Sequence, residues 1–365
     1  GKGFEIHGIF SSKLSYGYGS RYIKRKYIHQ NAVEIEDYYL FIKSVLQKER
    51  YVSIIPMRDS AAEVMCKYRD DLLQYTAYVM PDADGFERGF DKQRLMEVCK
   101  MHGYPHPETY IVRNGSLCGL DIEEIRYPVL IKPNHTFGAR GMTLCRNKDE
   151  LEKKYPIIFN QFGECHLQTY IPEGGHQVEV QIYINEKQEL VQSSVIKKFR
   201  WYPNKGGSSC CNISCKNEKI VDICYKVLKS IGWVGFADFD TIEDPRTGEL
   251  LIMEINPRVP ACVKSAFASG IDWADVIVGE YLKKSHKVYQ MNREVYLRFL
   301  GVEVLWFLKS ENKWHTKPNW FNFFGKDIFY QDMSDWTDPM PFIRGTIGNI
   351  KKQLSPEFRK SKAGV

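Results

Sequence analysis

The first 90 residues alternate segments of strand-like and helix-like hydrophobic spacing. Residues 4–10, 51–55 and 76–80 are short runs rich in branched aliphatic and aromatic side chains, as buried strands are, whereas residues 35–46 carry hydrophobic side chains at helical spacing. Strands that alternate with helices are typical of a parallel α/β unit. We therefore predict an α/β N-terminal domain with a partial parallel sheet over residues 1–90.

The pattern changes after Asp91, where one helix is followed mainly by strands. Leu95, Met96 and Cys99 share a face of that helix, and Gly103 supplies the left-handed residue that ends it. Strands are then predicted at residues 128–132, 142–145 and 177–184, the last alternating hydrophobic and polar positions as a half-buried strand does. We expect α+β lobes over residues 91–165 and 166–290, followed by an aromatic-rich C-terminal extension over residues 291–365.

The most informative stretch is a predicted hairpin that carries acidic side chains on an otherwise apolar pair of strands. An Asp-Pro-Arg-Thr-Gly turn centred on Arg246 joins the strands and would place Asp238 opposite Glu254, with Asn256 on the same face. Like charges directly across a ladder are destabilising, and Mg²⁺ would compensate for them because it prefers oxygen ligands. The alternative is that one acid points to solvent or pairs with Arg258.

Two further segments have residues suited to phosphate. Lys132 ends a predicted buried strand, and Gly138, Arg140 and Gly141 lie in the loop that follows. Glycines let backbone N–H groups approach phosphate oxygens, and the basic side chains add positive charge. Lys92 lies in the first turn of a helix, where a cation opposes the helix dipole. The alternatives are a plain hairpin turn and a solvated lysine, and the loop is not a Walker A motif.

Composition narrows the class of protein. The chain has 365 residues with 43% hydrophobic and 26% charged residues, as ordinary globular proteins have, and we find no apolar run of about 18 residues that would predict a membrane span. The ten cysteines lack zinc-site spacing, so we expect free thiols in a reducing cytoplasm. The net charge of +6 is accompanied by no nucleic-acid-binding motif, so we expect a solvated basic surface and no nucleic-acid partner.

In their order along the chain, these features resemble the ATP-grasp superfamily. The similar segments are Asp91-Lys92 before a helix, the PVLIKP strand, the glycine loop, LQTYIP at residues 167–172, the GGSS loop, GWVGFADFD and MEINPR. The segment SDWTDPMP at residues 334–341 is similar to the end of a stand-alone subgroup of carbamoyl-phosphate-synthase-like ATP-grasp ligases. The chain opens at what looks like the second strand of the family's first domain, so we expect that domain to lack its first strand.

The resemblance implies that ATP lies between two α+β lobes, and it suggests a role for each matching residue. Lys92 and Lys132 would contact the phosphates, and Gly138, Arg140 and Gly141 would form a loop over them. The backbone of Gln168, Thr169, Tyr170 and Ile171 would read adenine, although the family often has Glu where Gln168 stands. The ribose contact stays open between Gln177 and Glu179. Asp238, Glu254 and Asn256 match the Mg²⁺ ligands, and Arg258 with Lys132 would stabilise the transferred phosphoryl group.

The function that the resemblance implies is an ATP-dependent, ADP-forming ligase that activates a carboxylate as an acyl phosphate and joins it to an amine or another nucleophile. The alternatives are an ATP-grasp phosphotransferase that stops at phosphoryl transfer and a nucleotide-binding module without catalysis. We expect small-molecule carboxylate and amine substrates, and ATP with one or two Mg²⁺ ions that Mn²⁺ could replace. The aromatic-rich extension could cover the acceptor pocket or mediate a homodimer.

Overall fold

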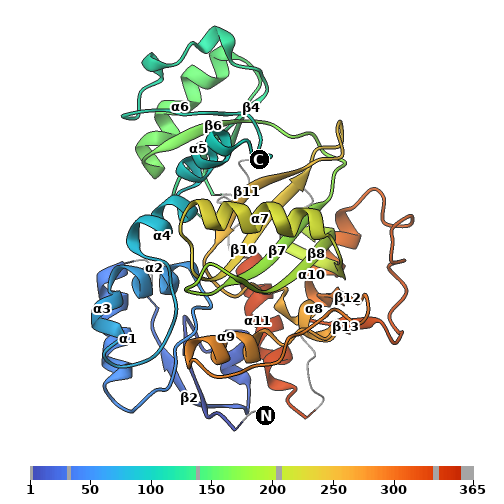
Figure 1. Cartoon of the computed structure of the whole chain (residues 1–365). Coiled ribbons are helices and arrows are strands. Elements are labelled where there is room, and N and C mark those ends of the chain that lie inside the picture. Colours follow the sequence, from blue (N-terminus) through green and yellow to red (C-terminus); the bar gives the residue numbers. More distant parts are fainter. Residues whose placement is uncertain (1–2, 31–33, 137–139, 203–207, 332–336, 355–365) are drawn as a thin grey trace.

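A computed structural model describes residues 3–30, 34–136, 140–202, 208–331 and 337–354 of the chain. They form a two-stranded, a four-stranded and a seven-stranded sheet with helices around them (Figure 1). Among these residues, no helix combines the length and the apolar content needed to cross a bilayer.

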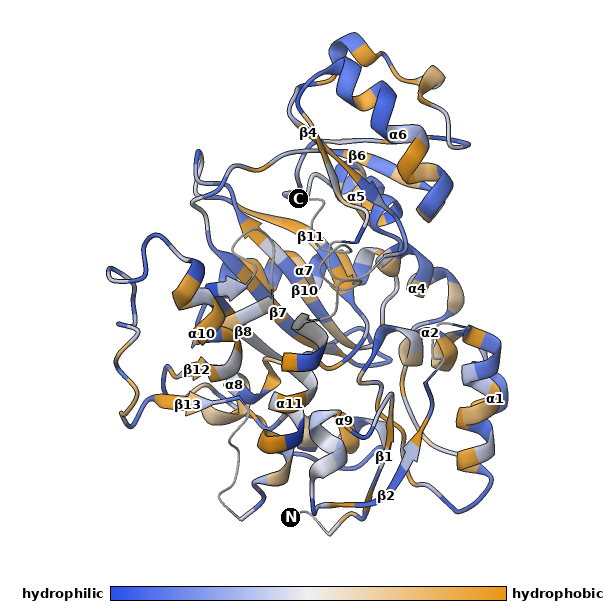
Figure 2. Ribbon diagram, turned by 180° about the vertical axis from the view of Figure 1, so that it is seen from behind, coloured by the Kyte–Doolittle hydropathy of each residue, from blue (hydrophilic) through white to orange (hydrophobic). Residues whose placement is uncertain are grey.

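The N-terminal unit contains the small parallel sheet. Its elements are β1 (Ile6–Phe10), η1 (Tyr16–Gly19), β2 (Ile23–Ile28), α1 (Ile35–Leu46), α2 (Asp59–Lys67), α3 (Arg69–Leu72) and α4 (Ala83–Phe90). Strands β1 and β2 pair in parallel, and α1 occupies the predicted helical segment, with hydrophobic and hydrophilic residues alternating along it (Figure 2). The parallel pairing and this helix agree with the prediction for the N-terminal part.

The prediction that residues 51–55 and 76–80 form strands of a sheet is wrong. The two segments share a single isolated parallel bridge between Ser53 and Ala77. Pro56 directly follows the first segment, and a proline has no N–H to donate to a longer ladder. The segments therefore run as extended chain against the helices instead of widening the sheet.

In the small lobe, the second α-helix packs against an antiparallel sheet. Its elements are α5 (Lys92–His102), β3 (Thr109–Tyr110), η2 (Leu117–Gly119), η3 (Ile122–Glu124), β4 (Val129–Pro133), β5 (Thr143–Cys145), α6 (Lys148–Phe162) and β6 (Cys165–Thr169). The strand order is β3-β6-β4-β5. Asp91 caps α5 by accepting from the Arg94 N–H at 2.8 Å, and Gly103 ends this helix with φ +68°, as predicted.

The seven-stranded sheet forms the centre of the molecule. It contains β7 (Gln177–Ile184), β8 (Leu190–Tyr202), β9 (Ser208–Cys215), β10 (Gly235–Glu243), β11 (Leu250–Asn256), β12 (Tyr296–Arg298) and β13 (Ile328–Tyr330) in the order β11-β10-β7-β8-β9-β12-β13. The helices α7 (Glu218–Ser230), α8 (Val263–Ala268) and α9 (Trp273–Tyr281) pack around it.

The prediction that residues 177–184 form a half-buried strand is wrong. Strand β7 is buried on both faces, since the polar Glu179 and Gln181 are buried, as are the hydrophobic Val180 and Ile182. Helix α7 packs against β7, and the chain before α8 contacts the polar side chains from the other face. The polar positions of this strand therefore face the interior, where each needs a partner.

The C-terminal segment packs onto both earlier parts. After β12, α10 (Leu300–Lys309) buries Val302 and Trp306 against Cys210 of β9. Helix α11 (Met340–Leu354) returns to the N-terminal unit, where the Asp338 carboxylate just before it accepts from the Ser20 hydroxyl at 2.6 Å and from the Arg21 N–H at 3.1 Å. The extension thus adds strands to the central sheet and connects it to the N-terminal unit.

Candidate functional site

The acidic residues of the β10–β11 hairpin share one face of the sheet, but their pairing differs from the prediction. Asp238 lies opposite Asn256, and Asp240 lies opposite Glu254. The prediction assumed an unbroken ladder centred on Arg246, whereas the ladder shifts register between Asp240 and the next residue. The expected Asp238–Glu254 pair is therefore wrong, although both residues remain on the same face.

Asp238 has the features of a ligand for a cation. The residue is 1% exposed, and its Oδ1 atom is buried without a hydrogen-bond partner among the described residues. Arg258 approaches the other oxygen only to 4.0 Å. Burial, together with the nearby Glu179 and Asp240 carboxylates, raises the pKa of Asp238 well above its usual value. A bound cation would satisfy the orphaned oxygen and favour the ionised form.

Glu254 faces the small lobe, which carries both lysines predicted to contact phosphate. The Lys92 Nζ atom, from α5, lies 3.3 Å from a Glu254 oxygen and also donates to the Thr136 carbonyl at 2.7 Å. Lys132, at the end of β4, is buried and donates to the Gln168 side chain. Burial lowers the pKa of Lys132 to about 8, against the attraction of Glu254. The predicted phosphate-binding lysines thus come from the small lobe and approach the acidic face from that side.

Arg258 lies at the end of the acidic hairpin. Its Nε atom is 3.2 Å from Asp59 Oδ1, and its Nη2 atom donates to Asn256 Oδ1 at 3.3 Å. The side chain is 23% exposed. The arginine is thus oriented by the N-terminal unit and by a predicted metal ligand, so that it borders the same acidic face.

The predicted adenine hinge, Gln168 to Ile171, lies at the end of β6. The Thr169 N–H donates to the Glu108 carbonyl at 2.8 Å, and the Tyr170 N–H donates to the Pro128 carbonyl at 3.0 Å. These two amides are therefore occupied within the small lobe. The Gln168 side chain points to Lys132.

The predicted glycine loop is described only in part. The Arg140 side chain is exposed, and Gly141 has φ +74°, a left-handed conformation that favours glycine. The Arg140 carbonyl accepts from the Thr136 hydroxyl at 3.0 Å, which connects the two ends of the loop. Gly138 lies outside the described residues.

Asp240 and Lys198 also belong to the site, although the sequence did not lead us to include either among the residues of the cation site. The Lys198 Nζ atom, on β8, lies 2.6 Å from Glu179 Oε1 and 2.9 Å from Asp240 Oδ1. Burial alone would raise the pKa of Asp240, but the ion pair with Lys198 outweighs it and the pKa lies below its usual value. The Asp-Phe-Asp alternation in its strand puts Asp240 on the same face as Asp238. Of the two ribose candidates, Glu179 is engaged in this ion pair, and Gln177 is half-buried at the start of β7.

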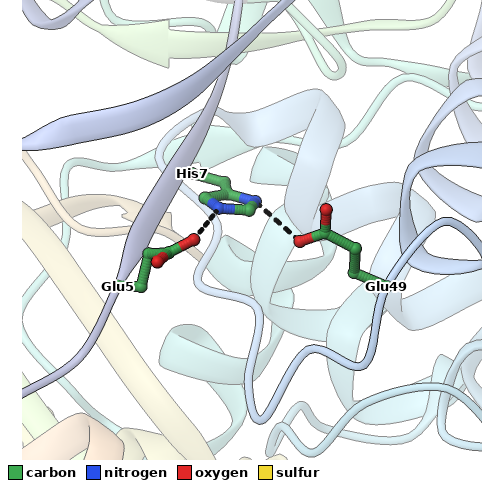
Figure 3. Close-up of side chains that lie close together, drawn as sticks. All are labelled: Glu5, His7 and Glu49. Atoms are coloured by element: carbon green, nitrogen blue, oxygen red, sulfur yellow. Dashed lines mark hydrogen bonds and ion pairs between the residues drawn. The ribbon is translucent and has the colours of Figure 1, made fainter.

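A second group of titratable side chains lies in the N-terminal unit and is balanced without a metal. His7 Nε2 is 2.8 Å from Glu5 Oε1, and His7 Nδ1 is 3.9 Å from Glu49 Oε2 (Figure 3). Lys24 pairs with Glu5, and Arg25 pairs with Glu49. Each acid thus already has a cationic neighbour, so this cluster is explained as a structural ion-pair network.

Comparison with protein families gives a match over the lobes that carry the site. The model of the "Carbamoyl-phosphate synthase L chain, ATP binding domain" matches residues 91–282. A D-aspartate ligase of Enterococcus faecium is 27% identical over 243 residues, which cover 60% of this chain and 58% of that protein. This chain spans less than two thirds of the length of three curated relatives that it matches, at 58%, 35% and 46%.

Solved structures share the fold. A biotin carboxylase from Campylobacter jejuni, in a complex described as β-γ-ATP, superposes with a TM-score of 0.64 at 18% identity over 76% of this chain and 66% of that one. The biotin carboxylase domain of Hydrogenobacter thermophilus 2-oxoglutarate carboxylase, described as a dimer with MgADP and bicarbonate, has a TM-score of 0.61 at 22% identity over 80% of this chain and 68% of that one. These similarities show a common fold.

Proposed function

We propose an ATP-dependent ligase activity for this chain, because it belongs to the carbamoyl-phosphate synthase L chain ATP-binding domain family of the ATP-grasp superfamily. The proposed reaction joins a small-molecule carboxylate to an amine or another nucleophile through an acyl phosphate. One observation carries the proposal: Asp238, Glu254 and Asn256 share a face, and two lysines of the facing lobe lie beside it. A sequence relative described as a D-aspartate ligase supports the ligase class.

The residues of the site fit a magnesium nucleotide. Asp238, Glu254 and Asn256 would hold Mg²⁺, since a buried oxygen of Asp238 has no hydrogen-bond partner in the part of the chain that the structure describes. The ion would neutralise negative charge on the phosphates. Lys92 and Lys132 would contact the phosphates from the small lobe. A similar structure that is described as binding MgADP supports this pairing of ion and nucleotide.

The adenine and ribose would lie along the hinge and β7. Thr169 and Tyr170 use their N–H groups within the lobe, so we propose that the Ile171 N–H and the neighbouring hinge carbonyls read adenine. Gln177 is the better ribose candidate because Glu179 is ion-paired. The glycine loop, with Gly138, Arg140 and Gly141, would close over the phosphates.

Positioning and charge stabilisation would account for the chemistry. The substrate carboxylate would attack the γ-phosphorus, ADP would leave, and an amine would then displace phosphate from the acyl phosphate. Arg258 and Lys132 would stabilise the charge on the transferred group. No side-chain nucleophile is required for these steps.

The test is ADP release from Mg²⁺-ATP in the presence of pooled carboxylate and amine candidates. The variants are Glu254→Gln and the control Glu249→Gln, which changes an exposed acid in the turn of the same hairpin. We expect substrate-dependent release that Glu254→Gln abolishes and Glu249→Gln leaves intact. Product analysis separates the classes, because an amide with free phosphate indicates a ligase and a stable phosphorylated product a phosphotransferase. Failure of the wild-type chain to bind ATP would refute the proposal.

A further inference from the structure

The acidic face has more carboxylates than one divalent cation would need. Glu179, Asp240 and Glu254 lie opposite one another in a row across β7, β10 and β11, and Asp238 lies two residues from Asp240 on the same face. Like charges opposite one another destabilise a sheet unless a cation compensates for them. The question is which carboxylates are already compensated by the chain itself.

Lys198 pairs with both Glu179 and Asp240, which we call the inner pair. Its Nζ atom contacts Glu179 at 2.6 Å and Asp240 at 2.9 Å, and the residue is only 7% exposed. The remaining oxygen of Glu179 contacts the Cys262 thiol, and the remaining oxygen of Asp240 accepts from the Asn256 amide at 3.1 Å. All four oxygens of these two acids therefore have a partner.

Asp238 and Glu254, which we call the outer pair, are less fully compensated. Asp238 Oδ1 is buried and lacks a partner among the described residues, and Glu254, whose side chain is 33% exposed, pairs with Lys92 at 3.3 Å. Lone pairs suited to a hard cation are thus available at Asp238 and Glu254, whereas those of Glu179 and Asp240 are used. The face therefore has one site open to a cation, at Asp238 and Glu254. Its other site, between Glu179 and Asp240, is filled by the ammonium group of Lys198.

We propose that Lys198 is a built-in second cation, so that this chain binds one divalent ion with its nucleotide, held at Asp238, Glu254 and Asn256, instead of two. This inference rests on the proposed function, since it assumes that the face binds a metal nucleotide. An ammonium group placed between two carboxylates balances their charge as a metal would, and it cannot be removed by dilution or chelation. In support, the pKa of Lys198 is raised well above its usual value even though burial opposes the charged form.

The experiment counts Mn²⁺ ions bound per chain in the presence of a saturating non-hydrolysable ATP analogue, using the electron paramagnetic resonance signal of free Mn²⁺. The variants are Lys198→Met, which removes the charge, and Lys198→Arg, which keeps it. Lys197→Met is the matched control, because Lys197 is adjacent in β8 and lies on the opposite face. We expect one ion for the wild type, the arginine variant and the control, and two for Lys198→Met.

The possible outcomes separate this inference from the proposed function. Two ions on the wild type, or one ion on a folded Lys198→Met variant, would overturn the inference and leave the ligase proposal standing. No ion on a wild-type chain that binds the analogue would overturn the metal site on which both rest. If Lys198→Met does not fold, the wild-type and Lys198→Arg counts still decide, since two ions on either contradict a built-in cation.

Discussion

A buried ion-pair triad beneath the aromatic C-terminal loop gives the sharpest prediction about stability. Glu303 is 0% exposed and accepts from Arg298 Nε at 2.7 Å, while Arg200, 1% exposed, pairs with its other oxygen. The arginines also donate to the backbone carbonyls of Pro318 and Trp320, the latter at 2.8 Å. One carboxylate thus compensates two buried cations that fix the loop, so Glu303→Gln should have a large effect.

The magnitude follows from the cost of breaking a buried ion pair. Removing one charged partner typically costs about 3–5 kcal/mol because the other charge stays buried without compensation. Glutamine keeps the shape of Glu303 and one accepting oxygen, so the loss is electrostatic and not a cavity effect. We expect the free energy of unfolding to fall by about 3–5 kcal/mol, a large part of the roughly 5–15 kcal/mol that stabilises a typical domain.

The assay is urea unfolding, combined with amide hydrogen exchange of residues 316–323, because a chain with several lobes need not unfold in one step. Glu311→Gln is the matched control, since Glu311 is an exposed acid in the neighbouring loop, and it should change stability by about 0.5 kcal/mol or less. The prediction would be refuted if the free energy of unfolding of Glu303→Gln lay within about 1 kcal/mol of the wild-type value and hydrogen exchange in the loop were unchanged. That result would show that the backbone carbonyls alone compensate the two arginines.

Three other predictions concern backbone packing, thiols and pH. Gly175→Ala should destabilise the protein by about 1–3 kcal/mol, since a Cβ atom would lie 1.8 Å from a backbone carbonyl of β10, whereas Gly119→Ala has open space; thermal unfolding of both variants tests this. Native iodoacetamide labelling should modify Cys118 much faster than the other nine cysteines, which are buried or half-buried, and protein labelled throughout at equal speed would contradict the fold. The His135 ring N–H donates to the Asp91 carboxylate, which raises the pKa of His135. The stabilising effect of this pair should therefore be full below about pH 6.5 and lost as pH rises through the higher folded pKa. The stability difference between wild type and His135→Asn, measured across pH 5–9, should shrink toward the alkaline end, and a constant difference would refute the assignment.

Much of the fold could be predicted from local patterns. The helix at residues 35–46 and the cap and stop of α5 depend on spacing and on single residues such as Asp91 and Gly103, so the sequence alone is enough to find them. The β2 strand, Ile23–Ile28, was missed because its lysines and arginine hide the alternation. Residues 51–55 had strand composition, but across the described ranges of the chain they pair through one bridge only.

The candidate site was predicted where it lies within one hairpin. Asp238, Glu254 and Asn256 share a face because side chains alternate along a strand, and no distant contact is needed to infer that. Their pairing could not be predicted, because the register, including the bulge after Asp240, depends on how both strands pack in the sheet. The roles of these residues stay predictions until the ligase and the Mn²⁺ experiments are done.

The sequence by itself determined the family, the helices at residues 35–46 and 92–102 and the acidic residues of the hairpin, since each of these follows from local motifs or from their order along the chain. Only the tertiary structure decided how the charges are balanced. Lys198 meets an acid 42 residues away, and Cys262 meets Glu179 across 83 residues. Such partners come together only when the sheet has assembled, because strand order and register, not spacing along the chain, determine which side chains share a buried face.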